Sequence, residues 1–199
     1  DILYDLKNTN VMFRLVQGDV GCGKTIVAQI SMYANQLAGY QSALLAPTEI
    51  LARQHVKNMH KLGLEATLYV SSLAAKEKKE ILEKLENGKI FNVVGTHALF
   101  QENVVFHNLG LVIADEQQRF GVKQRRSLLE KGKCVDFLMM SATPIPRTYA
   151  HFLYGDMDIS SIHTMPIGRK SVVTKYFKTA SMAPCLNDVL NFIKEGRQC

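Results

Sequence analysis

The chain has 199 residues, 47% of them hydrophobic, and its 24 basic and 18 acidic residues give a formal net charge of +6. This size and balance exclude a peptide hormone, a large multidomain machine and a disordered chain, and they are compatible with a polyanionic partner. No apolar run approaches the ~18 residues of a membrane span and no signal-peptide pattern opens the chain, so we expect a soluble cytoplasmic protein without a membrane partner. The four cysteines form no CxxC pair, so neither a zinc site nor a disulfide framework is expected.

Short apolar runs alternate with amphipathic stretches along the chain. Six runs have the length of buried strands: residues 13–17, 42–46, 66–70, 91–95, 109–114 and 135–140. Apolar helical faces lie between them, one formed by Ile50, Leu51, His55, Met59 and Leu62 and another by Ile81, Leu82 and Leu85. This alternation predicts an α/β fold of three layers, in which helices flank a mostly parallel central sheet.

The local sequence pattern changes from residue 144 onward, where prolines interrupt the chain at Pro144, Pro146 and Pro166. We expect a first domain over residues 1–168 and the opening of a second over residues 169–199. The second contains one predicted strand, residues 172–177, and one predicted helix, residues 182–194, which is too little for a core of its own. Since the chain also opens without Met, we expect a piece of a longer protein.

A glycine-rich motif follows the first predicted strand. Its sequence fits GxxxxGK[ST], and its residues are Gly18, Asp19, Val20, Gly21, Cys22, Gly23, Lys24 and Thr25. A helical pattern follows directly, and this strand-loop-helix context is what a phosphate-binding loop requires. Backbone N–H groups would bind the phosphates of a nucleotide, Lys24 would reach the β- and γ-phosphates, and the Thr25 hydroxyl would ligate Mg²⁺. The alternative is a chance glycine-rich turn.

Two adjacent carboxylates, Asp115 and Glu116, end the apolar run of residues 109–114. Ligands of open α/β sheets bind at such carboxyl ends of strands. We expect Asp115 to hold Mg²⁺ through water and Glu116 to act as the general base on the attacking water. An isolated Asp-Glu pair is more often a solvated turn, but a phosphate loop upstream makes the pair significant.

Several segments together resemble motifs I, Ia, Ib, II and III of superfamily 2 helicases, in order. They are the phosphate loop, Ala46-Pro47-Thr48-Glu49, Gly95-Thr96-His97, Asp115-Glu116-Gln117-Gln118 and Ser141-Ala142-Thr143. Residues 14–21, 96–101, 119–122 and 142–148 resemble more narrowly the RecG family of ATP-dependent branched-DNA helicases. The resemblance extends over residues 11–178 and implies a RecA-like P-loop NTPase fold, with the first motor lobe and the opening of the second.

The resemblance also implies activity and partners. Mg-ATP would drive translocation on DNA, with unwinding and remodelling of forks and junctions in bacterial recombination and repair. Seven residues are implied as DNA contacts: Pro47, Thr48, Glu49, Arg53, Gly95, Thr96 and His97. Without that context, His97 would be read as a buried histidine satisfied by hydrogen bonds. Ser141, Ala142 and Thr143 would couple the nucleotide to motion, and their strand is expected between those that carry the phosphate loop and the carboxylates.

One residue departs from the family pattern, and several parts are missing. Gln118 stands where RecG-like sequences usually carry His, and an amide can hydrogen-bond but cannot become cationic. A second RecA-like lobe with an arginine finger and an N-terminal wedge domain are expected partners outside these residues. Because such arginines contribute about 10³ to 10⁵ in rate, the chain alone should hydrolyse ATP very slowly.

Three alternatives stay open at this point. A transcription-repair coupling factor shares most of the motifs and differs in an RNA-polymerase-binding domain. A P-loop kinase acting on a metabolite would need a complete acceptor pocket within the chain. A binding module with a decayed site is the third, although Lys24, Thr25, Asp115 and Glu116 are all intact.

Overall fold

The computed structural model of the chain describes residues 1–8, 10–116, 128–143, 157–164, 174, 176 and 182–196. The chain divides into two compact units, Asp1–Pro166 and Ile167–Cys199. The described part of the second unit contains helix α7 (Ala183–Lys194), which begins with a proline in its first turn and matches the predicted helix. The predicted strand 172–177 lies largely outside the described residues.

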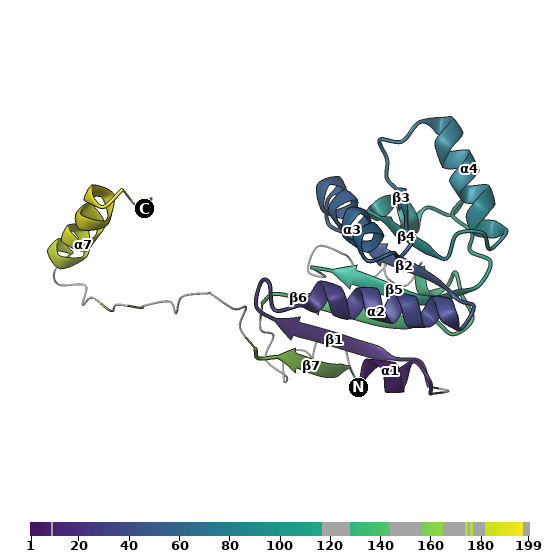
Figure 1. The fold of residues 1–199 in the computed structure, drawn as a ribbon, viewed down its shortest axis with the longest axis horizontal. Coiled ribbons are helices and arrows are strands. Elements are labelled where there is room, and N and C mark those ends of the chain that lie inside the picture. The colour runs from purple at the N-terminus through teal and green to yellow at the C-terminus, as the bar shows by residue number, and fades with distance from the viewer. Residues whose placement is uncertain are drawn as a thin grey trace. The chain divides into compact units, whose positions relative to one another are not determined.

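The first unit is built on a seven-stranded sheet in which every pair of neighbouring strands is parallel. Its order is β3-β4-β2-β5-β6-β1-β7 (Figure 1). The strands are β1 (Phe13–Gly18), β2 (Gln41–Leu45), β3 (Thr67–Tyr69), β4 (Asn92–Gly95), β5 (Leu109–Asp115), β6 (Asp136–Ser141) and β7 (Asp158–Ile162). Six of them match the predicted runs within two residues at each end, and β7 was not predicted.

Helices cover both faces of the sheet. They are α1 (Ile2–Asp5), α2 (Lys24–Leu37), α3 (Glu49–Lys61) and α4 (Ala75–Glu86), with a 3₁₀ turn η1 (His97–Phe100) after β4. Met32 of α2 and Met59 of α3 share one buried cluster with Leu44, whereas Leu85 of α4 belongs to a second cluster with Leu45. Adjacent strand residues such as Leu44 and Leu45 therefore face opposite layers, as the pleat of a strand requires. The three-layer α/β prediction is confirmed.

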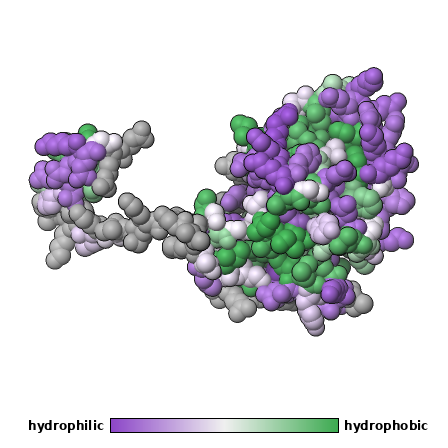
Figure 2. All heavy atoms as spheres, viewed as in Figure 1, coloured by the Kyte–Doolittle hydropathy of each residue, from purple (hydrophilic) through white to green (hydrophobic). Residues whose placement is uncertain are grey.

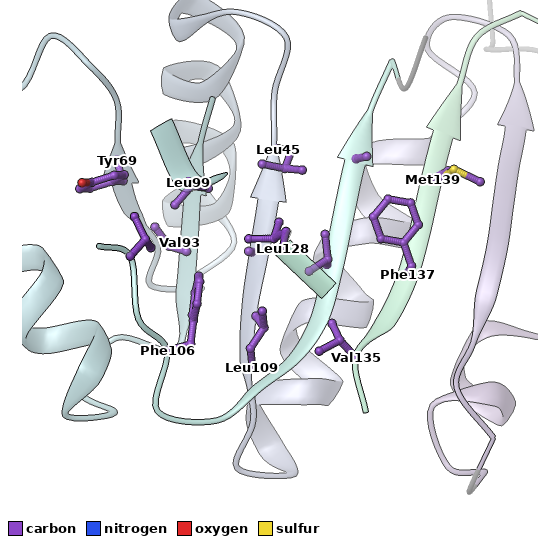
Figure 3. Close-up of a cluster of buried hydrophobic side chains, with 14 of the residues drawn as sticks. Leu45, Tyr69, Val93, Leu99, Phe106, Leu109, Leu128, Val135, Phe137 and Met139 are labelled. Carbon is purple, nitrogen blue, oxygen red and sulfur yellow. The ribbon is translucent and has the colours of Figure 1, made fainter. Parts of the chain in front are cut away.

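The second cluster is the larger core and lies on the α4 side of the sheet (Figure 3). Phe137 is 1% exposed, and its ring stacks on Phe13 with centroids 5.8 Å apart. Leu99 from the turn after β4 and Leu128 pack into the same cluster. The core thus holds β4 and β6 in the sheet, and predicted site residues lie at their carboxyl ends.

The predicted apolar face of α3 is only partly correct. His55 and Met59 are buried, but Ile50 is 79% exposed and Leu62 is 58% exposed. The buried stripe is Ala52, His55 and Met59, with spacings of three and four residues that keep it on one side of a helix. Ile50 and Leu62 lie near the two ends of the helix, beyond the area that it covers.

Helix α2 carries apolar residues on its outer side as well. Ile26, Ile30, Tyr33 and Leu37 are 42% to 71% exposed and recur every three or four residues. Figure 2 shows a broad apolar region on the face seen in Figure 1. Among the described residues, no helix is long and apolar enough to cross a membrane.

Strand β7 pairs with β1 at the edge of the sheet, and the side chain of Arg14 on β1 also contacts it. Arg14 is 9% exposed, and its Nε donates to Asp5 Oδ2 at 2.7 Å, while another guanidinium nitrogen donates to Ser160 Oγ at 2.9 Å. A third contact joins Arg14 to Asp158, the first residue of β7, at 3.3 Å. One arginine therefore ties α1 and β7 to the strand that leads into the glycine-rich loop.

Candidate functional site

The carboxyl ends of three neighbouring strands bring the predicted nucleotide residues together. Strand β6 lies between β5 and β1, as the family resemblance implied. Ser141 is paired with Gln17 at the end of β1, and Met140 is paired with Asp115 at the end of β5. The glycine-rich loop, the two carboxylates and Ser141 thus share one edge of the sheet, the usual ligand edge of an open α/β fold.

The glycine-rich loop connects β1 to α2 in a geometry that depends on glycine. Gly21 and Gly23 have φ angles of 81° and 103°, a region that side chains other than glycine rarely occupy. Gly23 is the N-cap of α2 and has no side chain with which to cap it, so the first N–H groups of α2 stay available to an anion. At Gly18, an added Cβ would lie 2.6 Å from Cys22 Sγ and 3.0 Å from the Ile162 carbonyl oxygen.

Lys24 folds back over this loop. Its ammonium donates to the carbonyl oxygens of Gly18 and Asp19, at 2.6 Å and 2.9 Å. The Asp19 carboxylate in turn accepts from the Val20 N–H at 2.6 Å. The positive charge is therefore fixed beside the helix N-terminus, where it reinforces attraction for a phosphate group. Thr25 is in the first turn of α2.

Asp115 and Glu116 leave β5 with different partners. The Asp115 carboxylate accepts through Oδ2 from His55 Nε2 at 2.9 Å. The backbone of Glu116 has a φ of 50°, a left-handed conformation that costs roughly 1–2 kcal/mol for a residue with a side chain. A hydrogen bond of 3.1 Å from Glu116 N–H to the Met140 carbonyl holds this turn. The two adjacent carboxylates consequently meet different partners, His55 for Asp115 and the Ala142 N–H for Glu116.

The segment after β6 contacts the carboxylate turn directly. Ala142 N–H lies 3.4 Å from Glu116 Oε1, a long hydrogen bond. The hydroxyls of Ser141 and Thr143 are 2.9 Å apart, and Thr143 N–H donates to Ser141 Oγ at 3.2 Å. The hydroxyl segment and the carboxylate turn therefore form one hydrogen-bonded unit.

Helix α3 begins at the end of β2 with the predicted motif Ia residues. Thr48 is the N-cap, and its hydroxyl accepts from Leu51 N–H at 3.3 Å. The Glu49 carboxylate accepts at 2.6 Å from the Ser72 hydroxyl, which lowers the pKa of Glu49; the charge of Arg53 contributes further. Because this carboxylate is already engaged and anionic, Glu49 suits a role in fixing the Ser72 loop better than direct contact with a phosphate. Pro47 precedes the cap and is half-buried.

The motif Ib residues at the end of β4 differ in their surroundings. Gly95 packs so closely that an added Cβ would collide with the Tyr69 carbonyl oxygen of β3. Thr96 is 3% exposed, and its hydroxyl has no hydrogen-bond partner among the described residues. His97 is exposed, which rules out the buried-histidine alternative. Of these three residues, only His97 has an exposed side chain that could contact a large ligand.

Sequence reasoning missed one residue of this edge, His55, and another predicted residue, Gln118, is not among the described residues. His55 was assigned only to the apolar face of α3, although its imidazole reaches Asp115. Its sole sequence signal is a polar ring within an otherwise apolar stripe.

Comparisons with known proteins agree with this geometry. Residues 2–152 match the family of DEAD/DEAH box helicases. The chain belongs to the DEAD/DEAH box helicase family. Over its whole length it is 51% identical to the ATP-dependent DNA helicase RecG of Staphylococcus aureus and to that of Staphylococcus epidermidis. It spans about 29% of the length of the Staphylococcus aureus protein.

Solved structures give the same relationship. A structure of RecG bound to a three-way DNA junction matches 97% of this chain at 44% identity with a TM-score of 0.76, and the match covers 26% of that protein. The Hef helicase domain of Pyrococcus furiosus matches 75% of the chain at 17% identity with a TM-score of 0.57, which supports the fold alone. The predicted resemblance to RecG is confirmed. A transcription-repair coupling factor and a metabolite kinase are not favoured.

Proposed function

We propose that this chain is the first motor lobe of a RecG-type ATP-dependent DNA helicase that unwinds and remodels forks and junctions in the bacterial cytoplasm. The observation that carries the proposal is the convergence at the ends of β1, β6 and β5. A phosphate loop, a hydroxyl segment and two carboxylates lie there on adjacent strands. A second lobe and a branch-recognising domain, outside these residues, would complete the motor.

In this proposal the loop residues 18–25 hold the phosphates of ATP. Lys24 exchanges its two carbonyl partners for β- and γ-phosphate oxygens, and the backbone N–H groups of the α2 N-terminus bind the same phosphates. The adjustment is small, because the ammonium already lies over the loop. Gly21 and Gly23 are required for the loop conformation rather than for chemistry.

The carboxylate edge fits Mg²⁺. Asp115 accepts from His55 through Oδ2, and no described residue bonds its Oδ1. Mg²⁺ in nucleotide sites is usually held by one or two protein oxygens together with phosphates and water. Thr25 would ligate the ion directly and Asp115 would hold it through water, and the ion would neutralise charge on the phosphates. Glu116 would orient the attacking water and accept its proton.

DNA would lie over the ends of β2 and β4. The cap at Thr48 and exposed Arg53 offer a helix N-terminus and a cation to backbone phosphates, and His97 contributes a little to the lowered pKa of Glu49. Gly95 and Thr96 would shape this surface from below. Through the hydrogen bond from Ala142 to Glu116, the presence or absence of the γ-phosphate would change the position of the hydroxyl segment, residues 141–143.

The test is ATP hydrolysis by the full-length protein with branched DNA, with linear duplex and without DNA. Junctions are expected to stimulate hydrolysis more than linear duplex does. Lys24→Ala should lower the stimulated rate by about 10²–10³-fold, because it removes a charge placed at the transferred phosphate. Lys84→Ala is the matched control, since Lys84 is an exposed lysine paired with Glu80 on α4. Hydrolysis indifferent to DNA, or unaffected by Lys24→Ala, would refute the proposal.

A further inference from the structure

His55 is a buried polar side chain in the apolar layer between α3 and the sheet. Its side chain is 7% exposed, and the Asp115 carboxylate it contacts is 18% exposed. The donor–acceptor distance of 2.9 Å is the usual distance of an N–H···O hydrogen bond. Since a carboxylate can only accept, the imidazole carries a proton on Nε2.

The other imidazole nitrogen gives no reason for a histidine at this position. Nδ1 is buried and has no hydrogen-bond partner among the described residues. Leaving such an atom unpaired costs free energy, and an apolar residue in its place would avoid that cost. The contact with Asp115 is therefore the one polar interaction of this ring, among the described residues, that accounts for a histidine here.

The contact also joins the proposed DNA-contacting part of the site to the proposed nucleotide part. His55 is on α3, seven residues after the Thr48 cap, so the ring lies about 10 Å along the helix axis from the proposed DNA-contacting end. Asp115 ends β5, and β2, which leads into α3, is its neighbour in the sheet. A shift of α3 relative to the sheet would therefore move the His55 ring, which donates the hydrogen bond to Asp115.

We propose that His55 is a positioning residue that orients the Asp115 carboxylate for Mg²⁺ and couples DNA contact at the N-terminus of α3 to Mg-nucleotide binding. This inference rests on the proposed function. Outer hydrogen-bond partners of metal ligands fix the orientation of the ligand, and their loss typically lowers metal affinity by about 10–100-fold. Because coupling between two binding sites is reciprocal, DNA and Mg-nucleotide should each strengthen binding of the other through this contact.

The experiment uses the full-length protein and a fluorescent ATP analogue, titrated with Mg²⁺ in the presence and absence of junction DNA. His55→Phe removes the donor and keeps a ring in the apolar layer. His55→Gln keeps an N–H donor at a similar reach. His60→Phe is the matched control, because His60 is on the same helix but bonds the Ala66 carbonyl instead of Asp115. Thermal unfolding of each variant is measured in parallel, and His55→Leu replaces His55→Phe if the latter does not fold.

We expect His55→Phe to raise the half-saturating Mg²⁺ concentration about tenfold or more, and to reduce the factor by which DNA tightens analogue binding. His55→Gln should stay within about threefold of the unaltered protein, and His60→Phe should not differ from it. Unchanged Mg²⁺ dependence in His55→Phe would overturn the role of His55 alone. Equal losses in His55→Phe and His55→Gln would also overturn it, because they would indicate packing. Absence of Mg²⁺-dependent analogue binding by the unaltered protein would instead refute the proposed function itself.

Discussion

Gly95 allows a direct test of why a glycine stands at the end of β4: because of packing within the protein, or because of DNA contact. In Gly95→Ala, the new methyl group would collide with the Tyr69 carbonyl oxygen on β3 and lie 3.0 Å from the Leu99 side chain. A backbone oxygen in a sheet cannot rotate away as a flexible side chain can. The variant must therefore separate β3 from β4 or distort the 3₁₀ turn that follows.

The expected cost follows from this geometry. Overpacking a well-filled core typically costs about 1–3 kcal/mol, and a backbone obstacle places Gly95→Ala near the upper value. For a domain of this size, each kcal/mol lowers the melting temperature by about 2–4 °C. We therefore expect a loss of about 6–12 °C, measured by circular dichroism at 222 nm on the chain. Gly39→Asn is the control, because Gly39 has nothing within 4 Å of an added Cβ and asparagine tolerates its φ of 84°.

DNA affinity of the full-length protein decides between the two interpretations. If packing is the reason for the glycine, the DNA affinity of Gly95→Ala should fall only because the distorted turn displaces His97. A melting temperature within about 2 °C of the unaltered chain, together with lost DNA binding, would refute the packing argument. That result would mean that the glycine is needed for close approach of the DNA.

Two further predictions concern stability. Burial raises the pKa of Asp136 above its usual 3.8, with Asp5 adding to the rise and the Met12 hydrogen bond opposing it. The neutral form is thus favoured on folding, and stability falls as pH rises through the folded pKa. Asp136→Asn should raise the free energy of unfolding by up to about 1 kcal/mol at about pH 7 and leave it unchanged at a pH below the pKa of Asp136 in the unfolded chain. Urea denaturation at several pH values between these two limits measures the difference. A difference between variant and unaltered chain that does not change with pH would contradict the prediction. Arg14→Met should cost about 1–3 kcal/mol by the same method, because it leaves the half-buried Asp5 carboxylate without its hydrogen-bonded partner, and adding Asp5→Leu should restore part of the loss. Additive losses in the double variant would refute the pairing.

The sequence predicts the parts of the fold that local patterns determine. Six strands have continuous apolar runs, because a parallel strand covered on both faces needs apolar residues throughout. Strand β7 escaped prediction because it is an edge strand that reads Asp-Ile-Ser-Ser-Ile. Its polar positions are explained only by partners far away in sequence, since Ser160 bonds Arg14 and Ser161 bonds Gln17.

The site divides in the same way. The strand-loop-helix arrangement around residues 18–25 could be predicted because the loop, its glycines and its lysine are contiguous. The contact between His55 and Asp115 could not, because it joins residues 60 positions apart and depends on the order of strands in the sheet. A histidine within an apolar helical stripe does not reveal its partner. Likewise, the left-handed backbone at Glu116 is fixed by Met140 on the neighbouring strand rather than by local sequence.

The strand order itself suggests where the two halves of the site communicate. The ends of β4 and β2 carry the proposed DNA residues, and the ends of β5, β6 and β1 carry the proposed nucleotide residues. These groups meet at the boundary between β2 and β5, which are joined by a ladder of backbone hydrogen bonds. Side chains above the sheet are freer to shift. The link from His55 on α3 to Asp115 on β5 crosses that boundary, so a displacement of α3 by DNA would reach the carboxylate proposed to hold Mg²⁺ without any change in the sheet.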